Sequence, residues 1–396
     1  MKNNSNEQIH ELLTRGVENV YPSVGFLEKE LKSGKKLSLY VGYDPTAPTL
    51  HIGHGITMLK LRQFQDLGHK VIFLVGDFTG MIGDPTDKSS ARQKLTRKQV
   101  LANCKLYKKQ ASAILDFAGK NPVQLRFNSE WSDRLNFGDV LELASHFTVP
   151  RLLERDMFQN RLKEGRTIYL HEFLYPMLQA YDMYVMRVNG QVGGNDQTFN
   201  MLAGRDLILD MDTRETFVLS MKLLADPSGK KMGKTEGNMI TLNDKPEDMF
   251  GKVMRWTDEM MISAFELCTR VPMEEIAQMS AAMKKGENPR NIKLRLAFEI
   301  TKTFLGEKAA QKGQDHFSTV IQSHDRPDTI PEIKPSAYDM VTVLVEAKFA
   351  SSKSDARRVI EGGGVKVNDA KINSFDATVE KGDVVQKGKR FFVKVK

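Results

Sequence analysis

Along the first half of the chain, short apolar stretches alternate with longer segments in which apolar residues recur every three or four positions. Four short stretches have the length and side-chain content of strands, namely 37–43, 71–76, 123–127 and 184–188. Between the first two, residues 52–67 have a helical pattern that ends at Gly68. This alternation predicts βαβ units, and therefore an α/β fold with a parallel sheet and helices on its faces.

The pattern changes in the second half. From about residue 246 to residue 322, Met, Leu and Ile recur at helical spacing without strand-like alternation, which predicts a separate helical domain. Residues 323–336 follow, and there Pro327, Pro331 and Pro335 punctuate a polar stretch. Proline removes hydrogen bonds from helix and sheet alike, so we expect a linker.

The tail beyond the linker has a pattern of its own. A helix start at 354–355 is followed by glycines at 362–364 that end the helix, and by a strand-like stretch at 365–368. This pattern predicts a small α+β module from whose helix Arg357 and Arg358 project.

Size and composition bound the remaining possibilities. At about 150 residues per domain, the 396 residues form two or three domains, and 40% hydrophobic with 27% charged residues is ordinary for a soluble globular protein. The longest apolar run, 71–75, falls short of the roughly 18 residues that span a bilayer, and residues 1–10 lack the apolar core of a signal peptide. Cys104 and Cys268 indicate neither a disulfide framework nor a zinc site. We therefore expect a cytoplasmic protein with no membrane association.

Charge is concentrated at the end of the chain. Residues 338–396 carry 12 basic and 8 acidic residues, which is half of the net charge of +8. A basic terminal module without an apolar stripe favours nucleic acid over membrane as its partner. On charge alone, a solubilising surface explains the excess equally well.

The strongest local signal is the segment 40–54, which reads YVGYDPTAPTLHIGH. A strand ends, a proline-containing loop turns, and His51 and His54 flank Gly53 at the start of the predicted helix. Free backbone N–H groups and the positive end of the helix dipole suit this place to an anion such as a phosphate. Two surface histidines beside a helix cap are the alternative interpretation.

A second signal is the loop 226–235, DPSGKKMGKT. Its three lysines supply charge that can neutralise a polyphosphate at the transition state. Taken alone, the loop is equally well explained as a solvated charge run.

Together the two segments resemble the HIGH and KMSKS signatures of class I aminoacyl-tRNA synthetases, and their neighbours resemble the bacterial tyrosyl-tRNA synthetase family in particular. The resemblance covers nearly the whole chain and includes an S4-like tail with SKSDARR at 352–358 and GGVKVN at 363–368. Two segments depart from the family pattern: KMGKT at 231–235 replaces KMSKS, and GGNDQ at 193–197 replaces GGSDQ.

The resemblance implies a domain order. We expect a Rossmann-like catalytic domain at 1–225, the KMSKS-type loop at 226–243, a helical anticodon-recognition domain at 244–326, a linker at 327–337 and an S4-like RNA-binding domain at 338–396. In the last of these, Arg357 and Arg358 are the expected RNA-binding residues.

The resemblance also implies a tyrosine site. Tyr40 and Asp182 match the partners of the substrate hydroxyl, while Asp84, Tyr175 and Gln179 match those of its ammonium group. Gln197 helps to hold the tyrosine. The spacing of Tyr175, Gln179 and Asp182 places the three on one helical stripe.

For the nucleotide, the resemblance assigns Thr46 and His51 to the pyrophosphate side, with His54 and Gly53 near ATP and its ribose. Further nucleotide- or substrate-side candidates are Asp44, Thr57, Asp196 and Gln197. The leaving group is held by charged and polar loop residues, namely Lys88, Arg92, Lys231, Lys234 and Thr235.

The implied reaction is the ligation of L-tyrosine to tRNA(Tyr) by way of tyrosyl-adenylate. Because the substrate carboxylate is itself the nucleophile, catalysis rests on positioning and charge stabilisation. ATP is a substrate and is expected with Mg²⁺, for which no protein carboxylate cage is visible and no metal-ligating residues are assigned. The family resemblance further implies a homodimer.

Two other interpretations compete. The first is another HIGH-bearing adenylate-forming enzyme, either a tryptophanyl-tRNA synthetase or a small nucleotidylyltransferase; the Tyr40 and Asp182 pair and the S4-like tail argue against both. The second is an RNA-binding or regulatory protein that keeps the fold without its chemistry. Against it stand the intact His51, His54, Lys231 and Lys234, which a chain without catalysis would not need.

Overall fold

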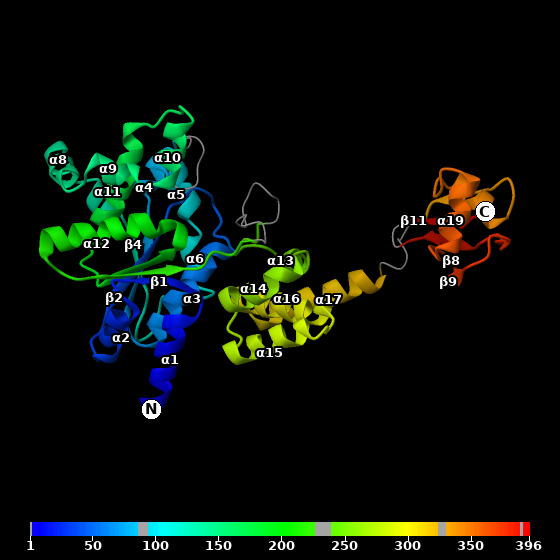
Figure 1. The fold of residues 1–396 in the computed structure, drawn as a ribbon, viewed down its shortest axis with the longest axis horizontal. Helices are drawn as coiled ribbons and strands as arrows, with labels where there is room; N and C mark the ends of the chain where they lie inside the picture. The colour runs from blue at the N-terminus through cyan, green and yellow to red at the C-terminus, as the bar shows by residue number, and fades with distance from the viewer. Residues whose placement is uncertain (1, 86–93, 226–238, 324–329, 389–390) are drawn as a thin grey trace. The chain divides into compact units, whose positions relative to one another are not determined.

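The structure is a computed structural model that describes residues 2–85, 94–225, 239–323, 330–388 and 391–396. The chain divides into two compact units, Met1–Gln314 and Asp315–Lys396 (Figure 1). Within the described residues, no helix combines the length and the apolar character that crossing a membrane requires.

The first unit is built around a six-stranded sheet in the order β1-β6-β5-β2-β3-β4. All neighbours are parallel except β1, which runs antiparallel to β6. This parallel sheet confirms the α/β prediction. The strands are β1 (Val17–Tyr21), β2 (Ser38–Tyr43), β3 (Lys70–Val75), β4 (Gln124–Phe127), β5 (Gly190–Gly194) and β6 (Phe217–Met221).

Helices cover both faces of this sheet, because alternate residues of its strands are apolar and buried on both sides. Tyr40, Ile72 and Leu74 pack against α11 (Leu170–Val185) and α12 (Thr198–Asp212). Phe64 of α3 (Ile52–Asp66) stacks on Phe217 of β6. The other helices of this part are α1 (Lys2–Thr14), α2 (Val24–Lys32), α4 (Thr79–Ile82), α5 (Arg97–Cys104), α6 (Tyr107–Ala111), α7 (Ser129–Ser132), α8 (Phe137–Ser145), α9 (Val149–Leu153), α10 (Asp156–Lys163) and the 3-10 turn η1 (Asn195–Gln197).

One predicted strand is wrong. Residues 184–188 close α11, where Tyr184, Val185 and Met186 pack as helix against the cluster around Tyr40, and Arg187 breaks the helix at φ 51°. The strand comes next, as β5. Its sequence, GQVGG, has low strand propensity, and its first glycine is required because a Cβ there would lie 2.4 Å from the Phe217 ring. Packing against the neighbouring strand β6 decides that this segment forms a strand. The local sequence pattern contains no information about that packing.

The predicted helical stretch is confirmed. After residue 239 the first unit continues as helices only, and α13 packs on α16 while α14 packs on α15 and α16. They are α13 (Pro246–Met254), the 3-10 turn η3 (Asp258–Met260), α14 (Met261–Cys268), α15 (Met273–Lys284) and α16 (Pro289–Leu305), followed by α17 (Glu307–Ser323), in which the boundary of the two units falls.

The second unit contains a sheet in the order β7-β11-β10-β8-β9. Its core joins α18 and α19 to that sheet through residues such as Leu344, Ile360 and Val385. The elements are β7 (Glu332–Ile333), α18 (Met340–Glu346), α19 (Lys353–Glu361), β8 (Val365–Val367), β9 (Ala370–Ile372), β10 (Val384–Lys387) and β11 (Phe391–Val395).

The prediction that residues 323–336 form a linker without helix or strand is wrong in part. Although prolines flank them, Glu332 and Ile333 form an edge strand parallel to β11, because an edge strand needs hydrogen bonds on one side only. The predicted tail helix is confirmed as α19, but it begins earlier than expected, with Ser352 as its cap.

Gly190→Ala should destabilise the first unit. The added methyl group meets the Phe217 ring between two strands that cannot move apart, an overpacking that costs about 1–3 kcal/mol. The expected effect is a lower midpoint of thermal unfolding than that of the wild type. The control is Gly251→Ala in α13, where a Cβ meets no atom within 4 Å and alanine favours the helix by about 1 kcal/mol. Equal shifts for both variants would contradict the prediction.

Candidate active site

A cavity of about 450 Å³ opens at the carboxyl ends of the central strands. From β2 the chain moves outward to β3 and β4 on one side, and then returns to build β5 and β6 on the other. Such a reversal of strand order is where open α/β sheets bind their ligands. The topology therefore places a binding site between β2 and β5.

Every candidate site residue that the structure describes in the first unit lines this cavity. The set is Tyr40, Asp44, Thr46, His51, Gly53, His54, Thr57, Asp84, Tyr175, Gln179, Asp182, Asp196 and Gln197. The five loop candidates, Lys88, Arg92, Lys231, Lys234 and Thr235, lie outside the described residues.

The two histidines cap α3. His51 is the N-cap, and its Nδ1 accepts a hydrogen bond from the Gly53 backbone at 3.1 Å. His54 Nδ1 accepts from the His51 backbone at 3.1 Å, and the two rings stack with centroids 3.7 Å apart. The two histidine side chains thus form a capping box at the start of α3.

This arrangement sets the chemistry of both rings. Burial lowers the pKa of His51 to about 4 and also lowers the pKa of His54, so both are neutral at pH 7. Since each Nδ1 accepts from a backbone N–H, we infer that the proton of each neutral ring is on Nε2. The remaining ring nitrogen of each histidine is then a hydrogen-bond donor, which suits a phosphate oxygen next to the helix N-terminus.

Asp182 is a buried carboxyl group on α11. Its Oδ1 accepts from Trp131 Nε1 at 2.7 Å, and its Oδ2 accepts from Asn128 Nδ2 at 3.2 Å. Burial raises the pKa of Asp182 to about 8 against the effect of these two donors, and the pKa of Tyr40 is raised by burial and by Asp182. The cavity therefore contains a fixed carboxyl and a neighbouring phenol in an environment of low polarity.

Other carboxylates line the same cavity. Tyr175 donates to Asp44 Oδ2 at 2.9 Å, and Thr79 donates to Asp44 Oδ1 at 2.7 Å. Asp84 accepts from Gln197 Nε2 at 2.7 Å and lies 3.7 Å from the guanidinium of Arg155. Asp196 also lines the cavity. Asp44, Asp84 and Asp196 attract a cationic group such as an ammonium, while Asp182, with its raised pKa, is largely protonated at pH 7.

Thr57 and Tyr43 line the cavity beside α3. Their hydroxyls lie 2.8 Å apart, and the Thr57 hydroxyl also donates to the His54 carbonyl at 2.9 Å. Thr57 is therefore part of the hydrogen-bonded support of the histidine pair.

The ends of the second signature loop meet this cavity. Lys222, Leu223 and Leu224 line the cavity just before residue 226. Beyond residue 238, the Ile240 carbonyl accepts from the Ile52 backbone at 3.0 Å, and Leu242 donates to the Leu50 carbonyl at 2.8 Å. The chain thus leaves the cavity wall and returns to the histidine-bearing segment.

Asn128, Trp131, Thr79 and Arg155 were missed in the sequence, although each holds a candidate carboxylate. For Asn128 a signal existed, because it directly follows the strand predicted at 123–127 and so stands at the carboxyl edge of the sheet. Trp131 lies three residues further on, in α7. Nothing in the local pattern marked Thr79 or Arg155.

Across the described ranges, no group of three or more His, Cys, Asp or Glu side chains is placed to hold a metal ion.

In the second unit, Arg357 and Arg358 are exposed on α19. The guanidinium of Arg357 lies 5.8 Å from the centre of the Phe375 ring, and Arg358 pairs with Asp355 at 2.6 Å. Arg357 is thus an exposed cation over an aromatic ring, whereas Arg358 is paired with a carboxylate.

The raised pKa of Asp182 is testable by fluorescence, because the chain has two tryptophans, Trp131 and Trp256. In Trp256→Phe only Trp131 reports, and its indole donates to Asp182. We expect a transition in its emission near pH 8, with Asp182 protonated below and ionised above this pH. Adding Asp182→Asn should abolish the transition. A midpoint near pH 4 would contradict the burial argument.

Comparison with known protein families agrees with this geometry. Residues 32–322 match the family described as tRNA synthetases class I (W and Y). Residues 323–394 match the family described as Tyrosine–tRNA ligase SYY-like C-terminal domain.

Individual relatives match over nearly the full chain. The tyrosine–tRNA ligase of Thermotoga maritima is 43% identical over 98% of this chain and 97% of its own length. That of Haemophilus ducreyi is 42% identical, with 97% and 96% covered.

Solved structures share the fold. A C-terminally truncated mitochondrial tyrosyl-tRNA synthetase from Aspergillus nidulans superimposes with a TM-score of 0.66 at 20% identity, covering 81% of this chain and 100% of its own. The Archaeoglobus fulgidus tyrosyl-tRNA synthetase complexed with L-tyrosine gives 0.61 at 20% identity, with 78% and 99% covered. With both family models matched and relatives above 40% identity along the whole chain, the protein belongs to the class I tyrosine–tRNA ligase family.

Proposed function

We propose that the cavity between β2 and β5 is where this ligase activates L-tyrosine with ATP. The observation that carries the proposal is Asp182, a buried carboxyl held by Trp131 and Asn128 beside Tyr40. A buried acceptor of this kind is costly unless a ligand uses it. The phenol hydroxyl of tyrosine is a donor of the required type.

Asp182 and Tyr40 then recognise the hydroxyl of the substrate. The ammonium group binds at the other polar group of the lining, with Asp84, Tyr175 and Gln179 as its partners. Gln197, which already donates to Asp84 at 2.7 Å, orients this carboxylate and helps to hold the tyrosine. Asp44, Asp84 and Asp196 provide the negative potential that a bound cation needs, whereas Asp182, with a pKa raised to about 8, is largely protonated at pH 7.

Selectivity against phenylalanine follows from the same contacts. A phenyl ring would leave Asp182 and Tyr40 without the hydroxyl, and unpaired buried polar groups reject a ligand strongly; tyrosyl-tRNA synthetases are themselves the established example of this discrimination. Trp131 and Asn128 add to it because they hold the carboxyl in one orientation.

The nucleotide occupies the α3 side of the cavity. Thr46, His51 and His54 face the phosphates, and Gly53 allows the ribose to approach the helix. Asp44, Thr57 and Asp196 complete this side. Neutral Nε2 donors and the helix N-terminus stabilise charge that grows on the phosphates.

The chemistry needs no protein nucleophile. An oxygen of the tyrosine carboxylate bonds to the α-phosphorus while the bond to the β-phosphate oxygen breaks, so tyrosyl-adenylate forms and pyrophosphate leaves. A hydroxyl of the terminal tRNA ribose then attacks the tyrosyl carbonyl and AMP leaves. The charge of the pyrophosphate is proposed to be neutralised by the charged and polar residues Lys88, Arg92, Lys231, Lys234 and Thr235. Mg²⁺ is proposed to enter the site bound to ATP.

tRNA(Tyr) is proposed to contact the C-terminal unit. Arg357 and Arg358 stand exposed on α19, and half of the net positive charge lies in residues 338–396. Such charge attracts the phosphate backbone without reading sequence. The helical segment after residue 244 is the proposed anticodon-recognition domain. We place the reaction in the cytoplasm, with its substrates.

A homodimer is proposed on an exposed apolar surface of α8, α9 and α11. Phe137 is 77% exposed and Leu170 is 79% exposed, and Leu141, Val149 and Tyr169 are exposed on the same helices or their caps. α8 and α11 are in contact, and large apolar side chains exposed on neighbouring helices favour an interaction surface. A second copy of the chain is the proposed occupant.

ATP–pyrophosphate exchange without tRNA tests the activation step. Purified protein with Mg²⁺ should exchange with tyrosine and with no other amino acid. Asp182→Ala should lower kcat/KM for tyrosine by at least about a hundredfold, since it removes the partner of the hydroxyl, while circular dichroism stays unchanged. Full tyrosine kinetics in that variant would contradict the role of Asp182.

Light scattering tests the dimer. The mass should be about twice 44.8 kDa at micromolar concentration, and Phe137→Glu should reduce it toward one chain by placing a charge in the interface. Phe391→Glu, at an exposed position of the second unit, is the control and should leave the mass unchanged. A monomeric wild type would refute the proposal.

A further inference from the structure

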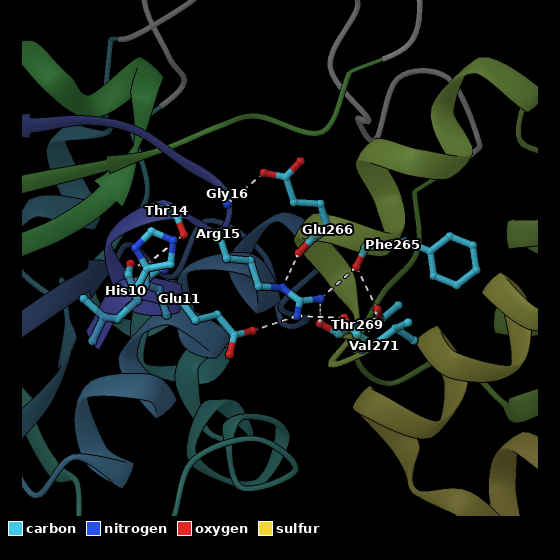
Figure 2. Close-up of polar contacts among 11 residues, drawn as sticks. His10, Glu11, Thr14, Arg15, Gly16, Phe265, Glu266, Thr269 and Val271 are labelled. Atoms are coloured by element: carbon cyan, nitrogen blue, oxygen red, sulfur yellow. Dashed lines mark hydrogen bonds and ion pairs between the residues drawn. The ribbon is translucent and has the colours of Figure 1, made fainter. Parts of the chain in front are cut away.

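Arg15 is a buried guanidinium between α1 and α14, 7% exposed (Figure 2). Its Nε donates to the Glu266 carbonyl at 2.9 Å, Nη1 donates to Glu11 Oε1 and to the Val271 carbonyl at 2.9 Å each, and Nη2 donates to the carbonyls of Phe265 and Thr269 at 3.1 and 2.7 Å. A guanidinium has five N–H donors. All five are used. Four of them bond to backbone carbonyls of the helical part of the first unit, which comprises residues 239–314.

These carbonyls belong to the end of α14 and the turn after it. The last carbonyls of a helix have no partner inside the helix and stand at the negative end of its dipole. Arg15 supplies both the donors and the charge from a residue about 250 positions earlier in the chain. One side chain thus connects the sheet-bearing part of the unit to four carbonyls of its helical part.

The same turn reaches back toward the sheet. Glu266 Oε1 accepts from the Gly16 backbone at 2.9 Å and from Lys222 Nζ at 3.1 Å. The Gly16 carbonyl in turn accepts from the Lys222 backbone at 2.9 Å. Gly16 has φ +65°, and a Cβ there would lie 2.7 Å from Leu267, so this close approach requires glycine. Glu266 therefore lies against the chain where β6 ends.

Lys222 begins a wall of the cavity. Lys222, Leu223 and Leu224 all line it, and Leu223 lies beside Gly194, where a Cβ would meet it at 3.0 Å and Asp196 at 2.5 Å. This wall is on the nucleotide side of the proposed site, and residue 226 follows it directly. The position of the wall thus depends on where Glu266 holds Lys222.

Apolar packing does not fix the junction by itself. A hollow of about 210 Å³ lies there, lined among others by Glu11, Arg15, Lys60 and Glu266. Beside this hollow, the polar contacts of Arg15 and Glu266 act together with apolar packing such as that of Leu267 against Gly16.

We propose that Glu266, held in place by Arg15, is a positioning residue for ATP. Glu266 fixes the position of the segment 222–224 and thereby the shape of the nucleotide side of the cavity. Glu266 itself does not contact tyrosine. The helical part is thereby coupled to ATP binding and not to amino-acid binding. The inference rests on the proposed activation of tyrosine in this cavity.

Glu266→Gln is the main test, because it keeps an acceptor for Gly16 and removes the charge facing Lys222. In pyrophosphate exchange we expect KM for ATP to rise on the order of fivefold or more, while KM for tyrosine stays within about twofold. Lys222→Met should do the same, and the double variant should add little, since both remove one interaction. Arg15→Lys should also raise KM for ATP; where it fails to fold, the Glu266 variant still tests the proposal.

The matched control is Glu275→Gln on α15, which removes an ion pair with Arg295 inside the helical part. It should leave both KM values unchanged. A partly exposed pair contributes little to folding, so unfolding midpoints of all the charge variants should agree with the wild type, and a merely structural role would not separate the two substrates.

The outcomes are distinct. An unchanged KM for ATP in folded Glu266→Gln, an equal rise for both substrates, or the same effect in Glu275→Gln would overturn this inference and leave the activity intact. Absence of tyrosine-dependent exchange in the wild type would overturn the proposed function, and this inference with it.

Discussion

The architecture depends on how α3 begins. Its first turn carries the histidine pair, its length packs on the sheet through Phe64, and the residue after His54 is a glycine because a Cβ there would lie 2.4 Å from the ring of Phe304 on α16. One helix thus meets the cavity at its end, the sheet on one face and the helical part on another. Any shift of the helical part moves Phe304 against the turn that holds His51 and His54. The chemistry of the site and the packing of the two parts of the first unit cannot vary independently.

The charges in the cavity follow from the same constraint. Burial keeps both histidines neutral, so they act as donors without adding positive charge. Burial also keeps Asp182 largely protonated at pH 7, so the other acidic and basic residues of the described lining are Asp44, Asp84, Asp196 and Lys222. Such a lining suits the ammonium group of an amino acid but opposes a triphosphate. In the proposed reaction, the further cations for the phosphates are therefore the ones assigned by the family resemblance, namely Lys88, Arg92, Lys231 and Lys234.

Much of this was predictable from sequence because the signals are local. The strands β2, β3 and β4, the helix α3 and the histidine cap each occupy a continuous stretch with its own periodicity. β5 was missed because its three glycines lower the strand propensity, and the first of them is required by Phe217 of the neighbouring strand. The strand in the linker was missed because it depends on β11, more than fifty residues later. The roles of most candidate site residues came from the family resemblance; the local pattern itself contributed the helix start with His51 and His54 and the stripe of Tyr175, Gln179 and Asp182. Arg155 and Arg15 carried no such signal, since their partners are known only once distant segments meet.

Asp182 shows what function requires of this fold. With a folded pKa of about 8 against an ordinary value of 3.8, the folded chain holds a proton between these pH values that the unfolded chain has lost. Stability therefore falls as pH rises through this range, and above pH 8 the full penalty of a buried carboxylate applies. Replacement by a neutral side chain would remove that penalty, yet the acceptor would go with it. Trp131 and Asn128 donate to both oxygens, which lowers the cost of ionisation and fixes the geometry at the same time. If Asp182 binds the substrate hydroxyl as proposed, the penalty of its burial is the cost of keeping that acceptor, as expected where selection acts on binding and on stability together.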